Sequence, residues 1–343
     1  MHSKPPYTIT EKAADSLAKI VETVTRLEYG TGFKRDVRLH RANRARTIYS
    51  SLAIEGNTLS LGEVTAVIDG KIVAGKQEEI KEVRNAYEAY DRMMTFDPYS
   101  VDDFLRAHRL MTEGLVAEAG RFRGGDVGVF DGGVAVHIGA RPQFVPGLVE
   151  DLLHWAKGSG LHPCLKSAIL HYEIETIHPF ADGNGRMGRL WQTLMLAQWN
   201  AIFAWIPMES VLYQHRPEYY AAIEAARTTD DSGPFIEFAL SAILEILLHM
   251  NTGEPEAGQA TEQATEQATE QATEQAAGQA EREERILAFC AKPRTRQEIQ
   301  TYIGITHREH FRANILMPLV KSGRLRMTIP GKPSSPNQKY VRG

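Results

Sequence analysis

Apolar side chains recur at the spacing of an α-helix through most of residues 1–251. In 11–27 they occupy positions 13, 14, 17, 20, 21, 24 and 27, which places them on one helix face. The same spacing predicts further helices in 77–94, 163–177, 187–199 and 235–250. Ser60 with Glu63 matches a capping box that opens a short helix, and Ser100 with Asp103 resembles a second one. This part of the chain is therefore predicted to be mainly α-helical.

A single segment, 124–146, departs from the helical spacing. Its glycines and its alternating apolar residues, which include Val127, Val129 and Ile138, predict a β-hairpin around Asp131-Gly132-Gly133. One small hairpin inside a helical domain cannot supply a core sheet. We therefore predict that it projects from the helices as a flap.

Residues 282–343 follow a different order of elements. The pattern predicts three helices, starting at Arg285, at Thr295 and at His307, with a turn at Gly304-Ile305-Thr306 between the second and the third. Two short strands, 324–329 and 338–341, follow around a loop rich in Pro, Gly and Ser. This order predicts a winged helix-turn-helix domain.

Composition separates the chain into unlike parts that the net charge of −4 conceals. Residues 252–281 contain four consecutive Thr-Glu-Gln-Ala units and carry a charge of −7, whereas residues 282–343 carry +9. Alanine is the only hydrophobic residue type in 252–281, so the segment cannot build a core and is predicted to be a linker. A coiled or partner-binding segment remains the alternative.

Cysteine content and hydropathy exclude other classes of protein. Cys164 and Cys290 are the only cysteines and lie far apart in sequence, which excludes a disulfide framework and a cysteine-based zinc site. The N-terminus has no apolar signal region, and no run approaches the ~18 uninterrupted apolar residues of a membrane span. We therefore expect a cytoplasmic protein without membrane contact.

The twelve residues from His178 to Arg189, HPFADGNGRMGR, are the densest in chemistry. Gly183, Gly185 and Gly188 have the spacing of a dinucleotide fingerprint, but that motif follows a strand, and here a helix precedes it. We therefore reject a Rossmann fold. Glycines just ahead of a helix beginning near Arg186 instead predict a turn whose amides bind phosphate.

The side chains around this turn fit the same chemistry. Arg186 and Arg189 share a face of the first helical turn. Two cations at a helix N-terminus are unfavourable with respect to the helix dipole, so their presence indicates that a polyanion binds there. Asp182 is a hard oxygen ligand suited to Mg²⁺, and His178 is a candidate general base. Phe180 is expected to anchor the loop to the core.

The whole string matches H-x-F-x-[D/E]-G-N-G-R-x-x-R, so the chain resembles the Fic (Fido) family over residues ~1–250. The resemblance implies a Fic-type helical bundle that transfers AMP from ATP to a Ser, Thr or Tyr hydroxyl of a target protein. It implies that His178 takes the hydroxyl proton and that Asp182 holds Mg²⁺. The related Doc branch, which phosphorylates, lacks this glycine pattern. The implied ATP-binding residues are Gly183, Asn184, Gly185, Arg186, Met187, Gly188, Arg189, Tyr219 and Tyr220.

A second motif strengthens the resemblance. Ser51, Glu55 and Gly56 fit the family's inhibitory pattern [S/T]-x-x-x-E-[G/N], which implies that Glu55 pairs with Arg189 and keeps resting activity low. The flap is implied to dock the target as an added strand. The residues implied in that docking are Val134, Ala135, Val136, His137, Ile138 and Gly139.

These observations divide the chain into four regions and leave some questions open. We predict an N-terminal helical region with the inhibitory helix, 1–95, a catalytic core, 96–251, the linker and the winged helix-turn-helix domain. Removal of AMP, with Glu55 orienting water, is an alternative reaction, and a nucleotide-sensing DNA-binding regulator is an alternative function. The C-terminal domain is expected to contact DNA through Arg308 and Arg312, or else a protein. Self-modification and a homodimer also remain open.

Overall fold

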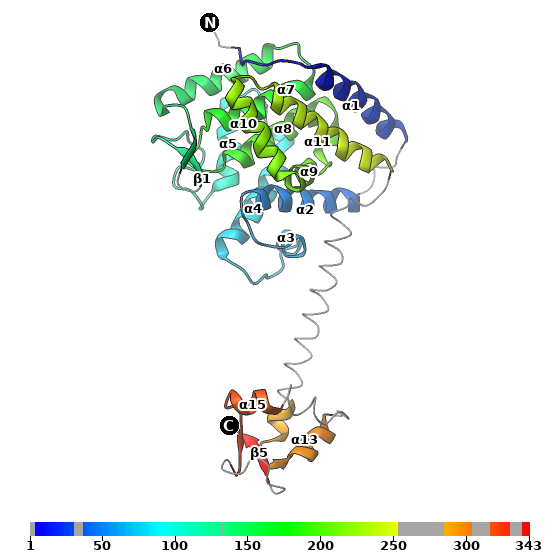
Figure 1. The fold of residues 1–343 in the computed structure, drawn as a ribbon, viewed down its shortest axis with the longest axis vertical. Coiled ribbons are helices and arrows are strands. Elements are labelled where there is room, and N and C mark those ends of the chain that lie inside the picture. The colour runs from blue at the N-terminus through cyan, green and yellow to red at the C-terminus, as the bar shows by residue number, and fades with distance from the viewer. Residues whose placement is uncertain (1–3, 31–36, 132–133, 253–284, 304–315, 330–337) are drawn as a thin grey trace. The chain divides into compact units, whose positions relative to one another are not determined.

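The computed structural model describes residues 4–30, 37–131, 134–252, 285–303, 316–329 and 338–343. The chain divides into two units, Met1–Glu256 and Ala257–Gly343, and each is described by itself (Figure 1). The predicted linker, apart from its first residue, and the predicted hairpin turn at Gly132-Gly133 lie outside the described residues.

The first unit is built from helices, which confirms the predicted fold class. Its helices are α1 (Glu11–Gly30), α2 (Val37–Ile54), α3 (Leu61–Ile68), α4 (Gln77–Asp91), α5 (Val101–Thr112), α6 (Val145–Gly158), α7 (Pro163–Ile177), α8 (Asn184–Trp199), α9 (Met208–Gln214), α10 (Arg216–Thr229) and α11 (Gly233–Thr252). Short 3-10 turns are η2 (Met93–Thr95), η3 (Pro142–Phe144) and η4 (Ala201–Ala204).

Helices α7 and α8 form the centre of this unit. They pack against each other more extensively than any other described pair of elements, and α11 packs against α7, α1 and α10 (Figure 1). Gly188 of α8 explains the close approach, because a Cβ at this position would lie 2.6 Å from Cδ2 of His171 on α7. The His178–Arg189 motif therefore spans the connection between these two buried helices and the start of α8.

In the first unit, the predicted helix starts and ends agree with the structure to within three residues. Ser60 and Glu63 form the full capping box, and the Ser100 hydroxyl accepts from the backbone N–H of Asp103. Helix α8 begins at Asn184 rather than near Arg186, because Gly183 adopts a left-handed φ of 88° and serves as the N-cap. The helix predicted over 77–94 ends at Asp91 and continues as η2.

The hairpin consists of β1 (Gly128–Asp131) and β2 (Val134–Ile138), which pair antiparallel with Gly128 opposite Ile138. The register shifts between Val129 and Phe130. It is a separate two-stranded sheet, so the predicted small hairpin is confirmed.

Helix α11 is the one helix among the described residues that is long and apolar enough to cross a membrane. The window Gly233–Met250 has a mean hydropathy of 1.5, and half of it is buried inside the unit. Because α11 packs against α1, α7, α9 and α10, we interpret it as a core helix of this unit.

The second unit has its own small core and sheet. Its elements are a helical segment 285–289, β3 (Arg294–Thr295), α13 (Arg296–Tyr302), α15 (Met317–Lys321), β4 (Leu325–Met327) and β5 (Lys339–Arg342). The strands form an antiparallel sheet in the order β3-β5-β4, of which β3 was not expected from the sequence. The predicted turn 304–306 and the predicted DNA-contacting Arg308 and Arg312 lie outside the described residues.

Candidate active site

His178 is the residue at which α7 ends. It adopts a left-handed conformation with φ 53°, which is uncommon for a residue other than glycine and marks a position held by its surroundings. Its Nδ1 lies 3.4 Å from the carbonyl oxygen of Glu175. Because a carbonyl only accepts hydrogen bonds, Nδ1 carries the proton, and in the neutral imidazole Nε2 holds the lone pair.

The turn after His178 leads directly into the N-terminus of α8. Gly183 donates its N–H to Oδ1 of Asp182 at 2.6 Å, and its left-handed backbone directs the chain into the helix. The first amides of a helix have no partner inside the helix. Because the Gly183 N–H is engaged by Asp182, the N–H groups of Asn184 and Gly185 are the ones presented beside the positive end of the α8 dipole, which favours an anion.

Asn184 and Phe180 hold this turn to the core. The Asn184 side chain accepts from the Phe180 N–H at 2.8 Å and donates to the Phe180 carbonyl at 2.9 Å, and it is 2 % exposed. Its amide is thus engaged, and any phosphate contact at this position would come from the backbone rather than from the side chain. Phe180 is fully buried, with its ring stacked on His108 at 3.6 Å.

Arg189 forms hydrogen bonds with the inhibitory motif on α2. Its guanidinium is 1 % exposed and donates to Oε1 of Glu55 at 2.6 Å, to the Ser51 hydroxyl at 3.0 Å and to the Ser51 carbonyl at 3.0 Å. The expected Glu55–Arg189 pair is therefore formed. Its second terminal nitrogen, Nη1, is buried without a partner among the described residues.

Local backbone structure explains how Glu55 reaches Arg189. Helix α2 ends in a Schellman motif, in which Asn57 N–H donates to the Leu52 carbonyl and Gly56 N–H donates to the Ala53 carbonyl. Gly56 has the left-handed φ of 93° that this motif requires. On the other side, a Cβ at Gly185 would lie 2.3 Å from Oε1 of Glu55, so glycine makes room for the carboxylate.

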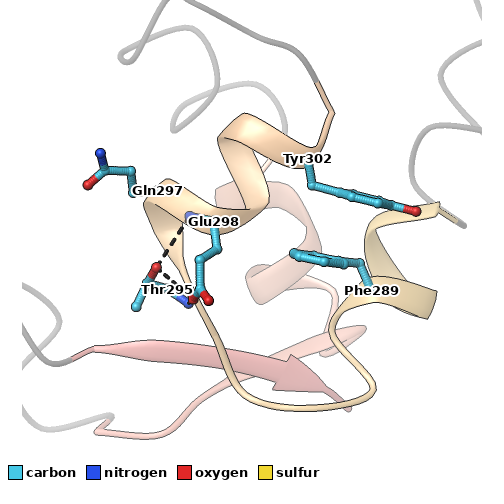
Figure 2. Close-up of a pocket in the computed structure, with 5 residues that line it drawn as sticks. All are labelled: Phe289, Thr295, Gln297, Glu298 and Tyr302. Carbon is cyan, nitrogen blue, oxygen red and sulfur yellow. Dashed lines mark hydrogen bonds between the residues drawn. The ribbon is translucent and has the colours of Figure 1, made fainter.

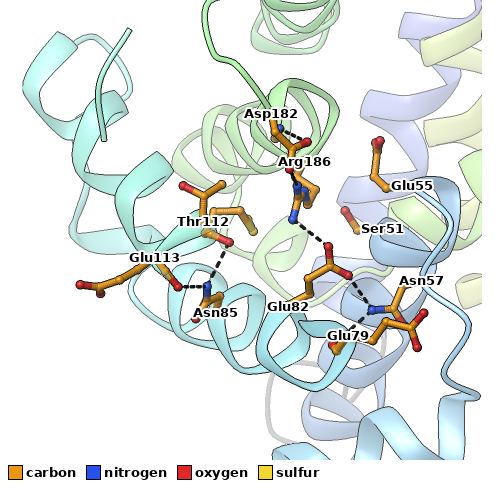
Figure 3. Close-up of polar contacts among 12 residues, drawn as sticks. Ser51, Glu55, Asn57, Glu79, Glu82, Asn85, Thr112, Glu113, Asp182 and Arg186 are labelled. Atoms are coloured by element: carbon orange, nitrogen blue, oxygen red, sulfur yellow. Dashed lines mark hydrogen bonds and ion pairs between the residues drawn. The ribbon is translucent and has the colours of Figure 1, made fainter. Parts of the chain in front are cut away.

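The other motif arginine, Arg186, is paired with acids as well (Figure 3). It donates to Oδ2 of Asp182 at 2.8 Å and lies 3.5 Å from Oε1 of Glu82 on α4. The other Glu82 oxygen accepts from the Asn57 side chain at 2.8 Å (Figure 3). Both motif arginines are therefore connected to the end of α2, Arg189 directly and Arg186 through Glu82.

A buried polar cluster lies behind Arg189. The Tyr219 hydroxyl is 3.1 Å from Nε2 of His171 and 3.4 Å from Oε1 of Glu175, and the other ring nitrogen of His171 contacts Gln192 at 2.7 Å. Burial, reinforced by the charge of Glu55, raises the pKa of Glu175 to about 7. Burial lowers the pKa of His171 to about 3, so its imidazole is neutral.

The structure separates the remaining predicted site residues into two groups. Met187 and Tyr219 are 0 % and 1 % exposed, and their side chains pack in the core rather than lining an open nucleotide site. Tyr220 is 48 % exposed and lies near Glu55 and Arg189; partial burial, reinforced by the charge of Glu55, raises its pKa above the usual value. The side chains of the flap residues Val134–Ile138 lie outside the described residues, and only their backbone is placed.

Asp182 is the residue that fits the implied Mg²⁺. Its side chain is 60 % exposed, and within the described residues its Oδ2 contacts only Arg186. No group of three or more His, Cys, Asp or Glu residues within the described ranges would hold a metal ion alone. One exposed carboxylate beside a phosphate site matches Mg²⁺, which is commonly bound by one or two carboxylates together with substrate phosphates.

Sequence reasoning did not identify His108 and Glu82. The backbone N–H of Gly120 donates to Nδ1 of His108, so the proton of the neutral imidazole is on Nε2, which donates to the Asp182 carbonyl at 3.0 Å. Burial lowers the pKa of His108 to about 4. His108 follows Phe104 by four residues on the buried face of α5. The sequence signal that could have identified His108 was a histidine at a helical position otherwise expected to be apolar.

The second unit contains a pocket of about 450 Å³ (Figure 2). Phe289 and Tyr302 line it and stack at 4.0 Å with their ring planes 3° apart. Arg294 lies 4.4 Å above the Phe289 ring, and Arg285 lies 5.8 Å from the Tyr302 ring. The pocket wall is therefore aromatic with cations on both outer faces of the stack.

Fold and site together define an α-helical domain built around a histidine and a glycine-rich turn at a buried helix N-terminus. Comparison with known families matches residues 98–196 to the Fic/DOC family. Residues 283–341 match the family described as "Filamentation induced by cAMP protein Fic-like, C-terminal domain". A Fic family protein from Desulfovibrio desulfuricans has a solved structure similar to this chain, with 39 % identity, a TM-score of 0.71 and coverage of 99 % of this chain and 98 % of that one. The chain belongs to the Fic family.

Two relatives of this chain are named as protein adenylyltransferases. Protein adenylyltransferase fic-1 of Caenorhabditis elegans is 29 % identical over 249 residues, which cover 67 % of this chain and 45 % of that protein. Protein adenylyltransferase Fic of Drosophila mojavensis is 31 % identical over 228 residues, covering 60 % and 43 %. The chain thus spans less than half the length of these relatives.

Proposed function

We propose that the chain is a protein adenylyltransferase that transfers AMP from ATP to a hydroxyl of a target protein and is held inactive by Glu55. The observation that carries the proposal is the Glu55–Arg189 ion pair beside the amides of Gly183–Gly185. The Glu55 carboxylate pairs with Arg189 beside a helix N-terminus that favours anions, which is where a phosphate of ATP would bind. The names of the curated relatives support the same reaction.

His178 is the proposed general base. With Nδ1 directed at the Glu175 carbonyl, Nε2 accepts the proton of the attacking hydroxyl. The oxygen then attacks the α-phosphorus of ATP, and the bond from that phosphorus to the bridging oxygen breaks to release pyrophosphate. A positioned general base contributes about 10²- to 10⁴-fold to such a step.

The phosphates are proposed to bind where the acids now lie. The amides of Asn184 and Gly185 bind phosphate oxygens, and Arg186 and Arg189 hold the β- and γ-phosphates once Glu82 and Glu55 release them. Asp182 would hold Mg²⁺, which when bound neutralises developing phosphate charge. Tyr220 lies at the exposed edge of this site.

The flap is proposed to dock the target. Strand β2, with Gly139 after it, offers backbone groups to an extended segment of the target, which would add a strand to the two-stranded sheet. Recognition through the main chain selects an extended shape rather than one sequence.

The experiment uses the Glu55→Gly protein incubated with ATP labelled either in the α- or in the γ-phosphate. We expect label on protein, either the chain itself or a lysate protein, from α-labelled ATP only, and none after His178→Ala. Label from γ-labelled ATP would indicate phosphoryl transfer and overturn the proposal.

Removal of AMP is a second candidate, favoured by the exposure of Glu55. Its side chain is 37 % exposed, so the carboxylate is accessible to a water molecule that it would orient. Loss of AMP from a previously modified protein, abolished by Glu55→Gly, would support removal over addition.

We also propose that the four regions 1–95, 96–251, 252–281 and 282–343 act as inhibitory region, catalytic core, linker and addressing domain in the cytoplasm. The +9 charge of 282–343 favours DNA as the partner. Salt-sensitive retention of DNA by the full chain would support this, whereas no retention at low salt would favour a protein partner. Sedimentation of the full chain would test the homodimer.

A further inference from the structure

Arg123 lies between α5 and the flap, outside both sequence motifs, and is 3 % exposed. Its Nε donates to the carbonyl of His178 at 2.7 Å, and its Nη2 donates to the carbonyl of Ile177 at 3.3 Å. Its backbone N–H donates to the carbonyl of Pro179 at 3.1 Å. The last carbonyls of a helix have no partner inside the helix, so Arg123 caps the end of α7 at the catalytic histidine.

The same guanidinium holds the base of the flap. Nη1 donates to the carbonyl of Gly125 at 2.8 Å, and Nη2 donates to the carbonyl of Ala140. These two residues lie on opposite sides of the hairpin, and Ala140 N–H in turn donates to the Ile177 carbonyl at 3.3 Å. One side chain therefore joins the segment before the flap, the segment after it and the end of α7.

Packing at this junction is tight. Gly139 N–H closes the hairpin base on the Val127 carbonyl at 3.0 Å. A Cβ at Gly139 would lie 2.8 Å from Nη2 of Arg123 and 3.2 Å from Cβ of His178. Guanidinium is planar, always charged and presents five N–H donors in a fixed fork, so no other side chain reaches these carbonyls in the same way.

We propose that Arg123 is a positioning residue for AMP transfer, which fixes the His178 imidazole and the target-binding strand relative to each other. The inference rests on the proposed function, because only in AMP transfer do His178 and the target-binding strand act on the same target hydroxyl. A target that enters along β2 must present its hydroxyl oxygen to Nε2 of His178. The Arg123 guanidinium positions both the end of α7 that carries His178 and the base of the flap that carries β2. The side-chain hydrogen bonds of Arg123 go to residues 125, 140, 177 and 178, and its backbone N–H goes to Pro179, so none of the bonds described for it reaches the Gly183–Arg189 turn.

The test compares Arg123→Lys, Arg123→Gln and Gly139→Ala in the full-length Glu55→Gly protein. We measure the rate of self-labelling from α-labelled ATP at saturating ATP, and the affinity for Mg-ATP by titration calorimetry. Arg121→Gln, at an exposed position two residues away, is the matched control. Ile20→Ala, fully buried on α1, controls for a general loss of stability.

We expect the rate to fall about 10- to 100-fold in Arg123→Gln and Gly139→Ala, as for a misplacement of about 1 Å between reacting groups. Arg123→Lys should fall less, and Mg-ATP affinity should stay unchanged in all three. Equal rates in Arg123→Gln and its parent overturn the inference, as does a parallel loss of ATP affinity or an equal loss in Ile20→Ala. A Glu55→Gly parent that transfers no AMP overturns the proposed function, and this inference with it.

Discussion

Removing the Glu55 carboxylate is the perturbation whose effect follows most directly from the structure. In Glu55→Gly, Arg189 loses a 2.6 Å charge-assisted hydrogen bond but keeps both contacts to Ser51. Hydrogen bonds to charged groups contribute about 1.5–3 kcal/mol. Because the Glu55 side chain is 37 % exposed, solvent screening favours the lower end, about 1.5 kcal/mol. At about 1.4 kcal/mol per factor of ten, Arg189 becomes about tenfold more available to ATP.

The assay is AMP transfer from α-labelled ATP at an ATP concentration below saturation. We expect labelling about tenfold above wild type for Glu55→Gly, in proportion to the freed Arg189. Glu55→Gln keeps a neutral hydrogen bond to Arg189 and should give a smaller increase. Glu88→Gln removes an exposed ion pair with Arg92 on α4 and should leave labelling unchanged.

Equal labelling of wild type and Glu55→Gly would refute this reasoning. It would mean either that the ion pair does not oppose ATP binding or that another group limits transfer. An increase in Glu88→Gln equal to that in Glu55→Gly would also refute it, because the effect would then not be specific to Arg189.

Three further predictions concern stability. Gly188→Ala should cost about 1–3 kcal/mol through overpacking, seen as a lower melting temperature, because its Cβ would lie 2.6 Å from His171; an unchanged melting temperature would show that α7 and α8 can separate freely. Asn184→Ala leaves the buried N–H and carbonyl of Phe180 without their partner and should cost about 2 kcal/mol in urea unfolding, and a loss near zero would contradict the anchoring role. Burial raises the pKa of Glu175 to about 7, above 4.5, so its contribution to stability is full at low pH and lost as the pH rises through about 7. The melting temperature of Glu175→Gln should therefore rise relative to wild type between about pH 5 and pH 8, whereas a constant difference would contradict the shift.

The sequence predicted the helical fold and the hairpin because each has a local signature, whereas the Glu55–Arg189 pair was implied by the resemblance to the Fic family. Helix faces repeat every three to four residues, and the Ser51-x-x-x-Glu55-Gly56 pattern carries its own helix end in Gly56. Where α8 begins was missed by two residues, because glycine at position 183 serves as the N-cap without a side chain to signal it.

The supporting residues were not predictable in the same way. Arg123 caps α7 through carbonyls 54 and 55 residues away in sequence, and Glu82 pairs with Arg186, 104 residues away. Nothing in the sequence around Arg123 or Glu82 marks these contacts. Asn184 and Tyr219 belong to the expected site, but their side chains are committed to the core. Such assignments depend on tertiary packing, which one-dimensional spacing does not contain.

The measurement that tests the central claim most directly is intact-mass spectrometry of Glu55→Gly and Glu55→Gly/His178→Ala after incubation with Mg-ATP, each with a cell lysate. We expect proteins carrying the added mass of one AMP with the first variant and no such proteins with the second. The absence of AMP adducts from both variants, or equal adducts in both, would contradict the account.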